Sequence, residues 1–478
     1  MLRVAGLKAG HDPADRPVPA ERERTVWRRF GKNFSLGFGG SALSSLIGVG
    51  RTAVMTKVLT VADFGRVLIV LNLAQFARVA ISVRVNDMLY RFMPEFKEQN
   101  DRAALQGLLI LALLLSLATG LIVAGGMVAL GPWIAQTFYR DANLVGLFGI
   151  YGVGALFLSL QEFCGTILRL EDEFPWVIAP QLLGNLVRLV LLATYLTLVH
   201  PYRLEWVVAI FALGLVVDEV PAMWRALVLI GPYLKGWTLR SARDGLQRHW
   251  GDIGSTLSQT TLSGYLQLTS NPGDQFVLGL LSTPEEVAVY GLAQQLVRPV
   301  RTLLRRNVQL AVSPETVSLW AQQRYRQLER MVWRLLVIGG LIGGLALIVL
   351  MPLARWGVVW VGKPKYLHSL PVFYVVSAET VLSVVLIAFY SIGLCMGLIK
   401  RRNLVLLASA VALGLVALTG MTAFKMASVQ LGGTLLMALF FDLPVMQRLH
   451  GLAQKPRPQQ RAEESATEGS ALARGEGG

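Results

Sequence analysis

The chain has 478 residues, of which 54% are hydrophobic and 16% are charged, and its formal net charge is +15. Soluble domains carry charges at roughly 25% of their positions, so this composition excludes an ordinary water-soluble protein. Excess Lys and Arg is found in nucleic-acid-binding proteins and also in the cytoplasmic loops of membrane proteins. No loop is long enough to fold a nucleic-acid-binding module, and we therefore expect no nucleic-acid partner.

Long apolar stretches recur along the chain. A helix of about 20 apolar residues crosses the bilayer core and satisfies its own backbone hydrogen bonds there. The pattern predicts an all-α polytopic membrane protein with about 12 transmembrane helices. The predicted spans are 33–58, 64–90, 103–130, 143–168, 174–199, 204–230, 253–281, 284–311, 331–353, 366–396, 403–422 and 426–446.

Three segments fall outside the spans. Residues 1–32 are basic and lack the apolar core of a signal peptide, which predicts a cytoplasmic N-terminal basic segment on anionic lipid. Residues 231–252 are predicted to form a cytoplasmic linker. The polar residues 447–478 are predicted to form a disordered cytoplasmic tail. Most Lys and Arg residues lie on the same side as the N-terminus, so both termini are predicted to be cytoplasmic.

One pattern occurs twice. Arg78 precedes Pro94-Glu95 by the same number of residues as Arg298 precedes Pro314-Glu315, and each pair follows a short turn between two predicted spans. The repeat predicts two six-helix bundles, and a site between two matching halves is typical of an alternating-access transporter. The predicted bundles are residues 33–230 and 253–446.

Arginines within the spans are the candidate substrate-binding residues. An Arg at mid-bilayer costs about 2.5 to 3.5 kcal/mol on insertion scales, so these side chains must face water or a partner. Guanidinium groups form planar bidentate hydrogen bonds with phosphate oxygens. We predict that Arg51, Arg78, Arg298 and Arg301 bind substrate. The alternative, strongest for Arg301, is that the side chains extend to the lipid headgroups.

Carboxylates within the spans are the candidate ion-coupling residues. Asp274 follows Asn271-Pro272-Gly273, which is expected to break its helix. Glu162 and Glu379 are the other two candidates. The alternatives are that Asp274 only caps a half-helix or pairs with an Arg, and that the two glutamates are ordinary satisfied partners within the fold. Asp218-Glu219 precede Pro221 and are expected near the cytoplasmic end, in contact with solvent.

Metal and nucleophile signatures are absent from the sequence. Cys164 and Cys395 fall inside predicted spans, and the five His residues have no ligand spacing. The chain has neither a phosphate-binding Gly-rich loop nor a nucleophile elbow. We predict no cofactor, no metal and no enzymatic activity.

Four short motifs follow one another along the chain. They are the Lys57–Gly65 turn, Asp274-Gln275 before Leu278-Gly279, Pro314, and Gly362–Tyr366. Together they resemble the polysaccharide biosynthesis transporters, the O-antigen and exopolysaccharide flippases of the multidrug/oligosaccharidyl-lipid/polysaccharide exporter superfamily. The Lys363-Pro364 pair departs from the tighter Gly-x-x-Tyr turn that is commoner in that family.

The resemblance implies two bundles related by a pseudo-twofold axis, with a polar cavity that opens alternately to each side of the bacterial inner (plasma) membrane. It implies that the protein moves undecaprenyl-pyrophosphate-linked oligosaccharide to the periplasmic leaflet for lipopolysaccharide O-antigen or exopolysaccharide synthesis. The implied partners are this lipid-linked oligosaccharide, membrane lipids, a coupling proton or sodium ion, and a polysaccharide polymerase with its glycosyltransferases.

Two other functions stay open. A multidrug or lipid II exporter of the same superfamily shares the architecture, but cationic drugs require acidic and aromatic groups in the cavity, whereas polyprenyl pyrophosphates require arginines. An O-antigen polymerase or ligase resembles chains with one large periplasmic loop. No predicted loop of this chain is that long.

Overall fold

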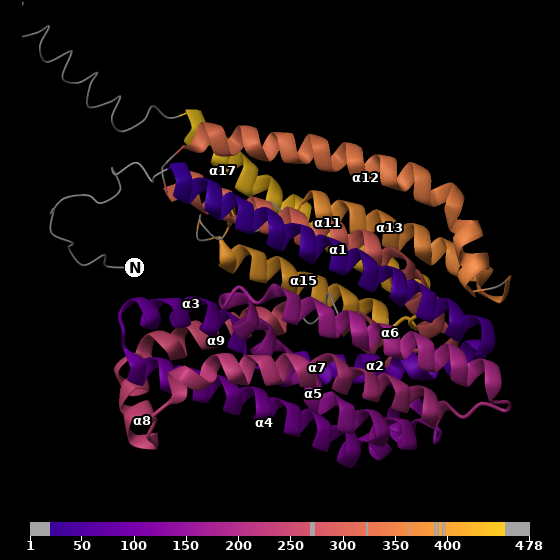
Figure 1. Ribbon diagram of the computed structural model, residues 1–478. Coiled ribbons are helices and arrows are strands. Elements are labelled where there is room, and N and C mark those ends of the chain that lie inside the picture. The colour runs from indigo at the N-terminus through magenta and orange to yellow at the C-terminus, as the bar shows by residue number, and fades with distance from the viewer. Residues whose placement is uncertain are drawn as a thin grey trace, which may run out of the picture.

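The computed structural model describes residues 20–454, except 268–272, 322–323, 363, 387–388, 390–391, 394–395 and 397. The described residues form helices joined by short turns and include no β-strand. The predicted all-α class is confirmed. Figure 1 shows the long helices running side by side in roughly one direction.

The first half of the chain forms seven helices. They are α1 (Ala20–Val58), α2 (Val61–Ile81), α3 (Val85–Glu98), α4 (Arg102–Ile134), α5 (Leu144–Leu170), α6 (Phe174–Leu198) and α7 (Leu204–Leu234), with a π-helical turn at Ala135–Tyr139. The predicted single span 64–90 is wrong, because the backbone of Ser82 is extended and separates α2 from α3. The β-branched residues Ile81, Val83 and Val85 at this break have lower helix propensity than most apolar residues.

The second half follows a short helix, α8 (Leu239–Arg248), that lies in the predicted linker. The long helices are α9 (Trp250–Gln267), α10 (Gly273–Leu281), α11 (Pro284–Ala321), α12 (Tyr325–Gly362), α13 (Leu370–Val385), α15 (Ile399–Ala417), α16 (Ala423–Met437) and α17 (Leu443–Gln454). A 3₁₀ turn at Pro364–Ser369 precedes α13, and a π-helical turn at Ala438–Asp442 joins α16 to α17. The last helix continues past residue 446, where the second predicted bundle ends.

Within the described residues, eight helical segments are long and apolar enough to cross a membrane by length and composition. They lie in α2, α4, α5, α6, α7, α12, α13 with its 3₁₀ turn, and α16 with α17. The other four predicted spans coincide with α1, α9 with α10, α11 and α15, which lie among these eight (Figure 1). The protein is therefore a multi-pass membrane protein.

Exposed tryptophans mark both ends of the long helices. Trp206 and Trp224 of α7 are both exposed and lie 18 residues apart, about 27 Å along a helix. This separation is close to the thickness of the hydrocarbon core, and tryptophan is enriched at the two membrane interfaces. Other exposed tryptophans near helix ends are Trp133, Trp176, Trp333, Trp356 and Trp360.

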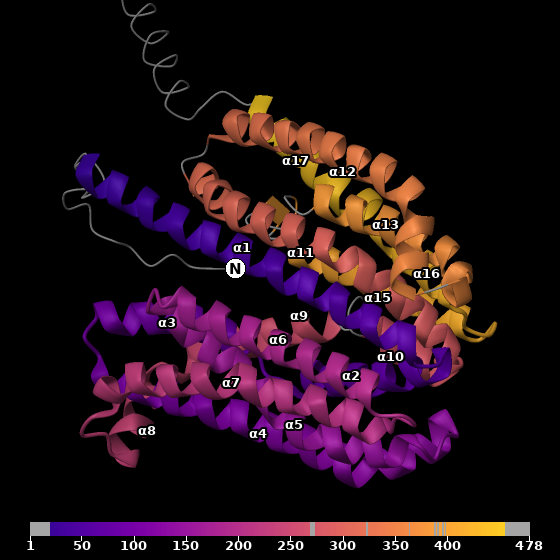
Figure 2. The same ribbon diagram turned by 45° about the vertical axis from the view of Figure 1, so that its right-hand side comes forward.

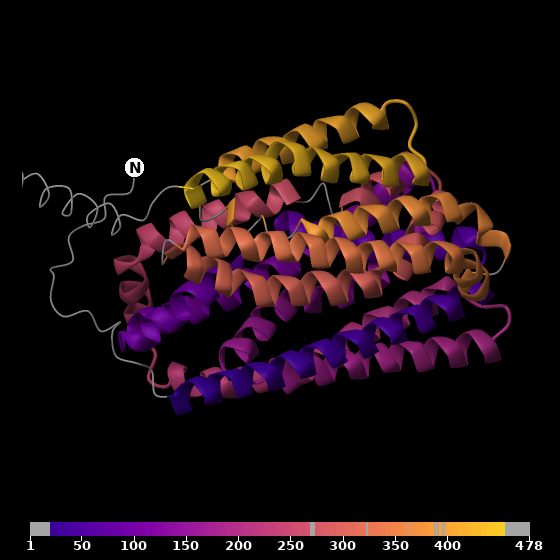
Figure 3. The same ribbon diagram turned by 90° about the horizontal axis from the view of Figure 1, so that it is seen from above.

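The helices gather into two groups, which Figure 2 separates clearly. Helices α2 to α7 form one group, and α11, α12, α13, α15, α16 and α17 form the other. Helix α1 runs between them and packs on α6, α11 and α12, and α2 packs on α11. Seen from above, α1 and α6 lie side by side along one edge of the molecule (Figure 3). Helix α9, predicted to belong to the second bundle, packs on both α3 and α15.

The repeated turns have the same local structure. The Thr60 hydroxyl accepts a hydrogen bond from the Asp63 amide (3.1 Å), and the Thr283 hydroxyl accepts one from the Glu286 amide (3.4 Å). Each threonine therefore caps the helix that follows it, α2 or α11. The two turns also touch, since a Cβ added to Gly65 would lie 1.8 Å from the Pro284 carbonyl oxygen. We call this end of the molecule, formed by residues 59–65, 281–287, 361–362 and 364–370, the turn end.

Further contacts join the two groups at the turn end. The Thr56 hydroxyl of α1 donates a hydrogen bond to the Val361 carbonyl of α12 (2.5 Å). The Lys365 ammonium donates one to the Leu59 carbonyl (2.5 Å). The rings of Phe64 and Tyr366 meet edge to face with centroids 6.2 Å apart. The turn end is thus closed by contacts between residues far apart in sequence.

Candidate functional site

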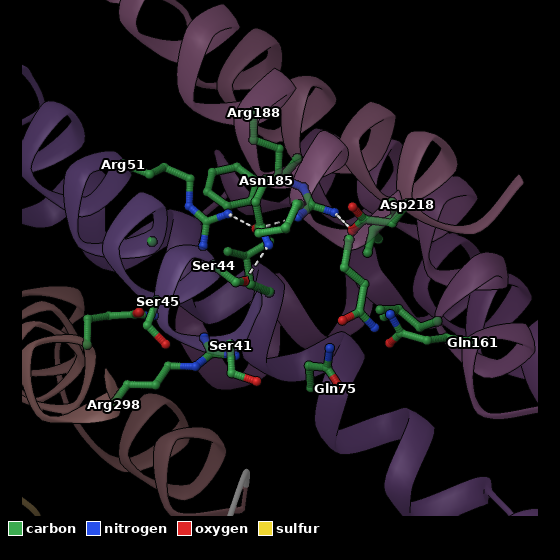
Figure 4. Close-up of a pocket in the computed structure, with 18 of the residues that line it drawn as sticks. Ser41, Ser44, Ser45, Arg51, Gln75, Gln161, Asn185, Arg188, Asp218 and Arg298 are labelled. Carbon is green, nitrogen blue, oxygen red and sulfur yellow. Dashed lines mark hydrogen bonds and ion pairs between the residues drawn. The ribbon is translucent and has the colours of Figure 1, made fainter. Parts of the chain in front are cut away.

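A polar cavity of about 500 Å³ lies between the two groups of helices. Its walls come from α1, α2, α5, α6 and α7 on one side and from α11 on the other (Figure 4). Most of its polar lining consists of neutral or cationic side chains. The polar residues are Ser41, Ser44, Ser45, Arg51, Asn72, Gln75, Tyr151, Gln161, Gln181, Asn185, Arg188, Asp218, Gln295 and Arg298.

Helix α1 presents one polar face to this cavity. Ser41, Ser44, Gly48 and Arg51 are spaced three or four residues apart, so they lie on one side of the helix. Helix α6 contributes Asn185 and Arg188 with the same three-residue spacing. Apolar residues on the other sides of these helices face lipid or neighbouring helices, so the polar side chains turn toward the cavity.

Asn185 connects two cationic residues. Its side-chain oxygen accepts hydrogen bonds from Arg51 (3.3 Å) and from Arg188 (3.0 Å). Its side-chain amide donates to the Ser44 hydroxyl (2.9 Å). The Arg51 guanidinium also lies over the Phe211 ring, 4.9 Å from its centroid. These contacts hold the two guanidinium groups beside each other, as Figure 4 shows.

The Asp218 carboxylate forms an ion pair with Arg188. Both residues are buried, and so is the next residue, Glu219, with 2% of its surface exposed. The prediction that Asp218-Glu219 contact solvent near a helix end is wrong. Asp218 lies near the middle of α7, which continues for four more turns through Pro221 to Leu234.

Arg298 reaches into the cavity from the opposite wall. Its side chain extends from α11 toward Ser41 of α1 (Figure 4), and it is exposed to the cavity. Among the described residues, no carboxylate lies within ion-pair distance of Arg298 or of Arg51. With Arg188 paired to Asp218, the cavity carries two arginines that have no carboxylate partner in the part of the chain that the structure describes. Such a site attracts an anion.

The other two predicted substrate-binding residues lie outside the cavity lining. Arg78 of α2 forms an ion pair with Glu162 of α5. Arg301 of α11 pairs with Glu379 of α13 (2.6 Å) and donates a second hydrogen bond to the Thr380 hydroxyl (3.0 Å). Each of the two predicted ion-coupling glutamates is therefore the partner of a predicted arginine. Their roles in binding or coupling stay predictions.

Asp274 lies in a separate buried cluster, with none of its surface exposed. Its carboxylate accepts hydrogen bonds from the Tyr290 hydroxyl (2.6 Å) and from the Gln275 amide (2.7 Å). The side-chain amide of Gln294 donates in turn to the Tyr290 oxygen (2.9 Å). Asn271 and Pro272, which are predicted to break this helix, lie outside the described residues. Within the part of the chain that the structure covers, no group of His, Cys, Asp and Glu has the arrangement of a metal site.

The sequence prediction missed Asn185, and it did not choose Arg188 for the site although this arginine lies within a predicted span and must face water or a partner. Their three-residue spacing on α6 and the matching Ser41, Ser44 and Arg51 spacing on α1 are visible in the sequence. The sequence does not show that α6 and α1 pack against each other. Only this packing brings the two patterns together in one site.

Comparisons with known proteins agree with this architecture. Residues 30–320 match the polysaccharide biosynthesis protein family. No curated protein matches the chain. Among solved structures, the chain is similar to an inward-facing multidrug resistance MATE family transporter of the MOP superfamily, at 15% identity and a TM-score of 0.59, covering 89% of this chain and 96% of that one. It is also similar to a MATE structure in the bent conformation, at 14% identity and a TM-score of 0.55, covering 89% and 95% of the two chains.

These likenesses establish the fold, and the family match covers more than half of the chain. The chain therefore belongs to the polysaccharide biosynthesis protein family and has the fold of the MATE and MOP superfamily transporters.

Proposed function

We propose that this membrane exporter moves a lipid-linked oligosaccharide, carried on undecaprenyl pyrophosphate, across the bacterial inner membrane for surface polysaccharide synthesis. The observation that carries the proposal is the cavity charge: among the described residues, Arg51, Arg188 and Arg298 line the cavity together with one carboxylate, that of Asp218. A diphosphate headgroup has the opposite charge and accepts several hydrogen bonds from guanidinium groups.

The neutral lining suits the sugar part of such a substrate. Serine hydroxyls of α1 and the amides of Asn72, Gln75 and Gln161 offer both donors and acceptors to sugar hydroxyls. At about 500 Å³ the cavity holds a headgroup and a few sugar rings, while the polyprenyl tail stays in the lipid. The protein's part is binding and movement, without bond chemistry.

Transport then follows from movement of the two halves about the cavity. With both termini cytoplasmic, the turn end faces the periplasm and its contacts close the cavity on that side. Opening the turn end and closing the opposite end carries the headgroup across. A proton or sodium ion at the buried Asp274 cluster is our candidate for resetting the halves, with Glu162 and Glu379 as secondary candidates.

Complementation tests this function. Wild type, Arg51→Ala and Arg298→Ala are expressed at matched membrane levels in a strain that lacks its own oligosaccharide flippase, and surface polysaccharide is quantified. We expect rescue by wild type and a loss of at least tenfold in each arginine variant, because each removes a charge-assisted contact worth about 1.5 to 3 kcal/mol. Arg330→Ala, which removes an exposed arginine of α12 that does not line the cavity, is the control and retains most of the rescue.

Each other outcome has a definite meaning. Equal rescue by all variants contradicts the proposal that the cavity arginines bind the phosphates of the substrate. If well-expressed wild type instead confers drug resistance without rescue, the multidrug alternative replaces the proposal. Accumulation of translocated but unpolymerised oligosaccharide in a polymerase-deficient strain separates export from a polymerase or ligase activity.

A further inference from the structure

We propose that Arg188 is a second oxyanion subsite of the cavity, and that the Asp218 carboxylate occupies this subsite whenever no anionic ligand is bound. The inference rests on the proposed function, because the ligand is the phosphate part of that substrate. It adds a residue that sets how tightly the substrate is held.

The first observation is that the Arg188–Asp218 ion pair is buried and that some of its polar atoms have no hydrogen-bond partner. Arg188 is 6% exposed and Asp218 is 5% exposed, and both line the cavity. Among the described residues, Arg188 Nε and Asp218 Oδ1 are buried without a hydrogen-bond partner, and so is Arg51 Nε next to them. A buried polar atom without a partner costs about 1 to 3 kcal/mol. The Arg188–Asp218 ion pair and the neighbouring Arg51 therefore do not use their full hydrogen-bonding capacity in the empty cavity.

The second observation is that α6 and α7 are shaped around this pair. A Cβ on Gly184 would lie 1.7 Å from Asp218 Oδ1, and a Cβ on Gly214 would lie 2.1 Å from Arg188 Nε. No side chain larger than hydrogen fits at either glycine without displacing the ion pair. The two glycines therefore create the space in which the guanidinium and the carboxylate meet.

The third observation is the link to Arg51. Asn185 accepts hydrogen bonds from both arginines, so their guanidinium groups lie on either side of one amide oxygen. A phosphate in the cavity beside this amide can accept hydrogen bonds from both guanidinium groups. The Asp218 carboxylate competes for the same guanidinium, because Arg188 has a fixed number of donors.

This competition suits a carrier. A site with three unopposed arginines would bind a diphosphate so tightly that release would be slow, since affinity differences appear mainly in the dissociation rate. A resident carboxylate keeps Arg188 ordered in the empty cavity and takes it back when the substrate leaves. Asp218 thus lowers affinity and speeds release.

Binding of inorganic pyrophosphate to the purified full-length protein in detergent tests the inference. The Asp218→Asn variant removes the competing charge and keeps the shape, so we expect pyrophosphate to bind about tenfold more tightly than to wild type. Glu219→Gln is the matched control, because Glu219 is the neighbouring buried carboxylate but does not line the cavity. This control is expected to bind as wild type does.

The charge-neutral double variant Arg188→Gln/Asp218→Asn keeps the test decisive even if the single variant does not fold. It lacks both partners, and it is expected to bind pyrophosphate more weakly than wild type and than Asp218→Asn. A double variant that binds as wild type, or an Asp218→Asn variant that binds no more tightly, overturns the subsite. Two results would instead defeat the proposed function itself. Wild type would bind no pyrophosphate, or Arg298→Ala would bind it as tightly as wild type does.

Discussion

Five arginines in the helices around the cavity differ in what balances their charge. Arg78, Arg188 and Arg301 each pair with a carboxylate from another helix. Arg51 and Arg298 have no such partner within the described residues and face the cavity. Because an unpaired charge inside a membrane is costly, the ion pairs of Arg78 and Arg301 are expected to contribute to the fold, whereas Arg51 and Arg298, together with the Arg188 subsite, belong to the proposed ligand site.

Two substitutions separate these classes. Arg78→Ala leaves Glu162 without its cation, so we expect the melting temperature of the detergent-purified protein to fall by several degrees, and Glu162→Gln added to it to recover part of the loss. Arg298→Ala breaks no ion pair between described residues and is expected to change the melting temperature by no more than about a degree. A fall as large for Arg298→Ala as for Arg78→Ala would show that both are structural.

At the scale of whole helices, sequence and structure agree on where the chain is helical and differ where the helices break. Apolar stretches of about 20 residues dictate the spans, so the order of the helices and the places of most of them were predictable. The break at Ser82 and the helix α8 in the linker were not, because both depend on local backbone and packing choices rather than on hydropathy. In the same way Arg51 and Arg298 were predicted from charge, while Asn185, Arg188 and Asp218 required knowledge of which helices meet.

Helix α8 also differs from the spans in direction. It lies crosswise to the long helices (Figures 1 and 2), and a Cβ on Gly107 of α4 would lie 2.4 Å from the Ala242 carbonyl oxygen of α8. Leu239 is 74% exposed, and Arg240 and Arg243 are exposed as well. A short helix with exposed apolar and basic residues is typical of one that lies in a membrane interface.

We therefore expect a spin label at Leu239 to contact lipid. In vesicles containing anionic lipid, and in a background where Cys164 and Cys395 are replaced, the label should collide readily with oxygen and rarely with a water-soluble nickel chelate. A label at Glu98, exposed at the end of α3, serves as the comparison and should show the reverse. Equal access of the chelate to both positions would place α8 in water.

At the scale of the whole molecule, contacts at the turn end hold the two halves together on one side of the cavity. The Lys365 contact with the Leu59 carbonyl and the Thr56 contact with the Val361 carbonyl cross directly from one half to the other. Gly65 and Pro284 add a close backbone contact between the repeated turns. Alternating access requires these contacts to break in part of the cycle.

Removing one of them should favour the state in which the turn end is open. Leu59 is fully buried, and Leu59→Cys in a background without Cys164 and Cys395 reports its access to a water-soluble maleimide. We expect Lys365→Ala to raise the labelling rate severalfold. Lys425→Ala is the control, since the Lys425 ammonium donates to Thr419 and Gly420 near it in sequence. Equal labelling in both variants would show that Lys365 does not hold this end closed.

The most direct test of the central claim is translocation in proteoliposomes. Undecaprenyl-pyrophosphate oligosaccharide is placed in one leaflet, and its arrival in the other is followed by the access of a sugar-specific lectin. We predict that wild type moves the lipid and that Arg51→Ala and Arg298→Ala move it at least tenfold more slowly, while Arg330→Ala, outside the cavity, moves it at nearly the wild-type rate. Equal rates in all four proteins, or no movement by well-folded wild type, would contradict a cavity built to carry a diphosphate.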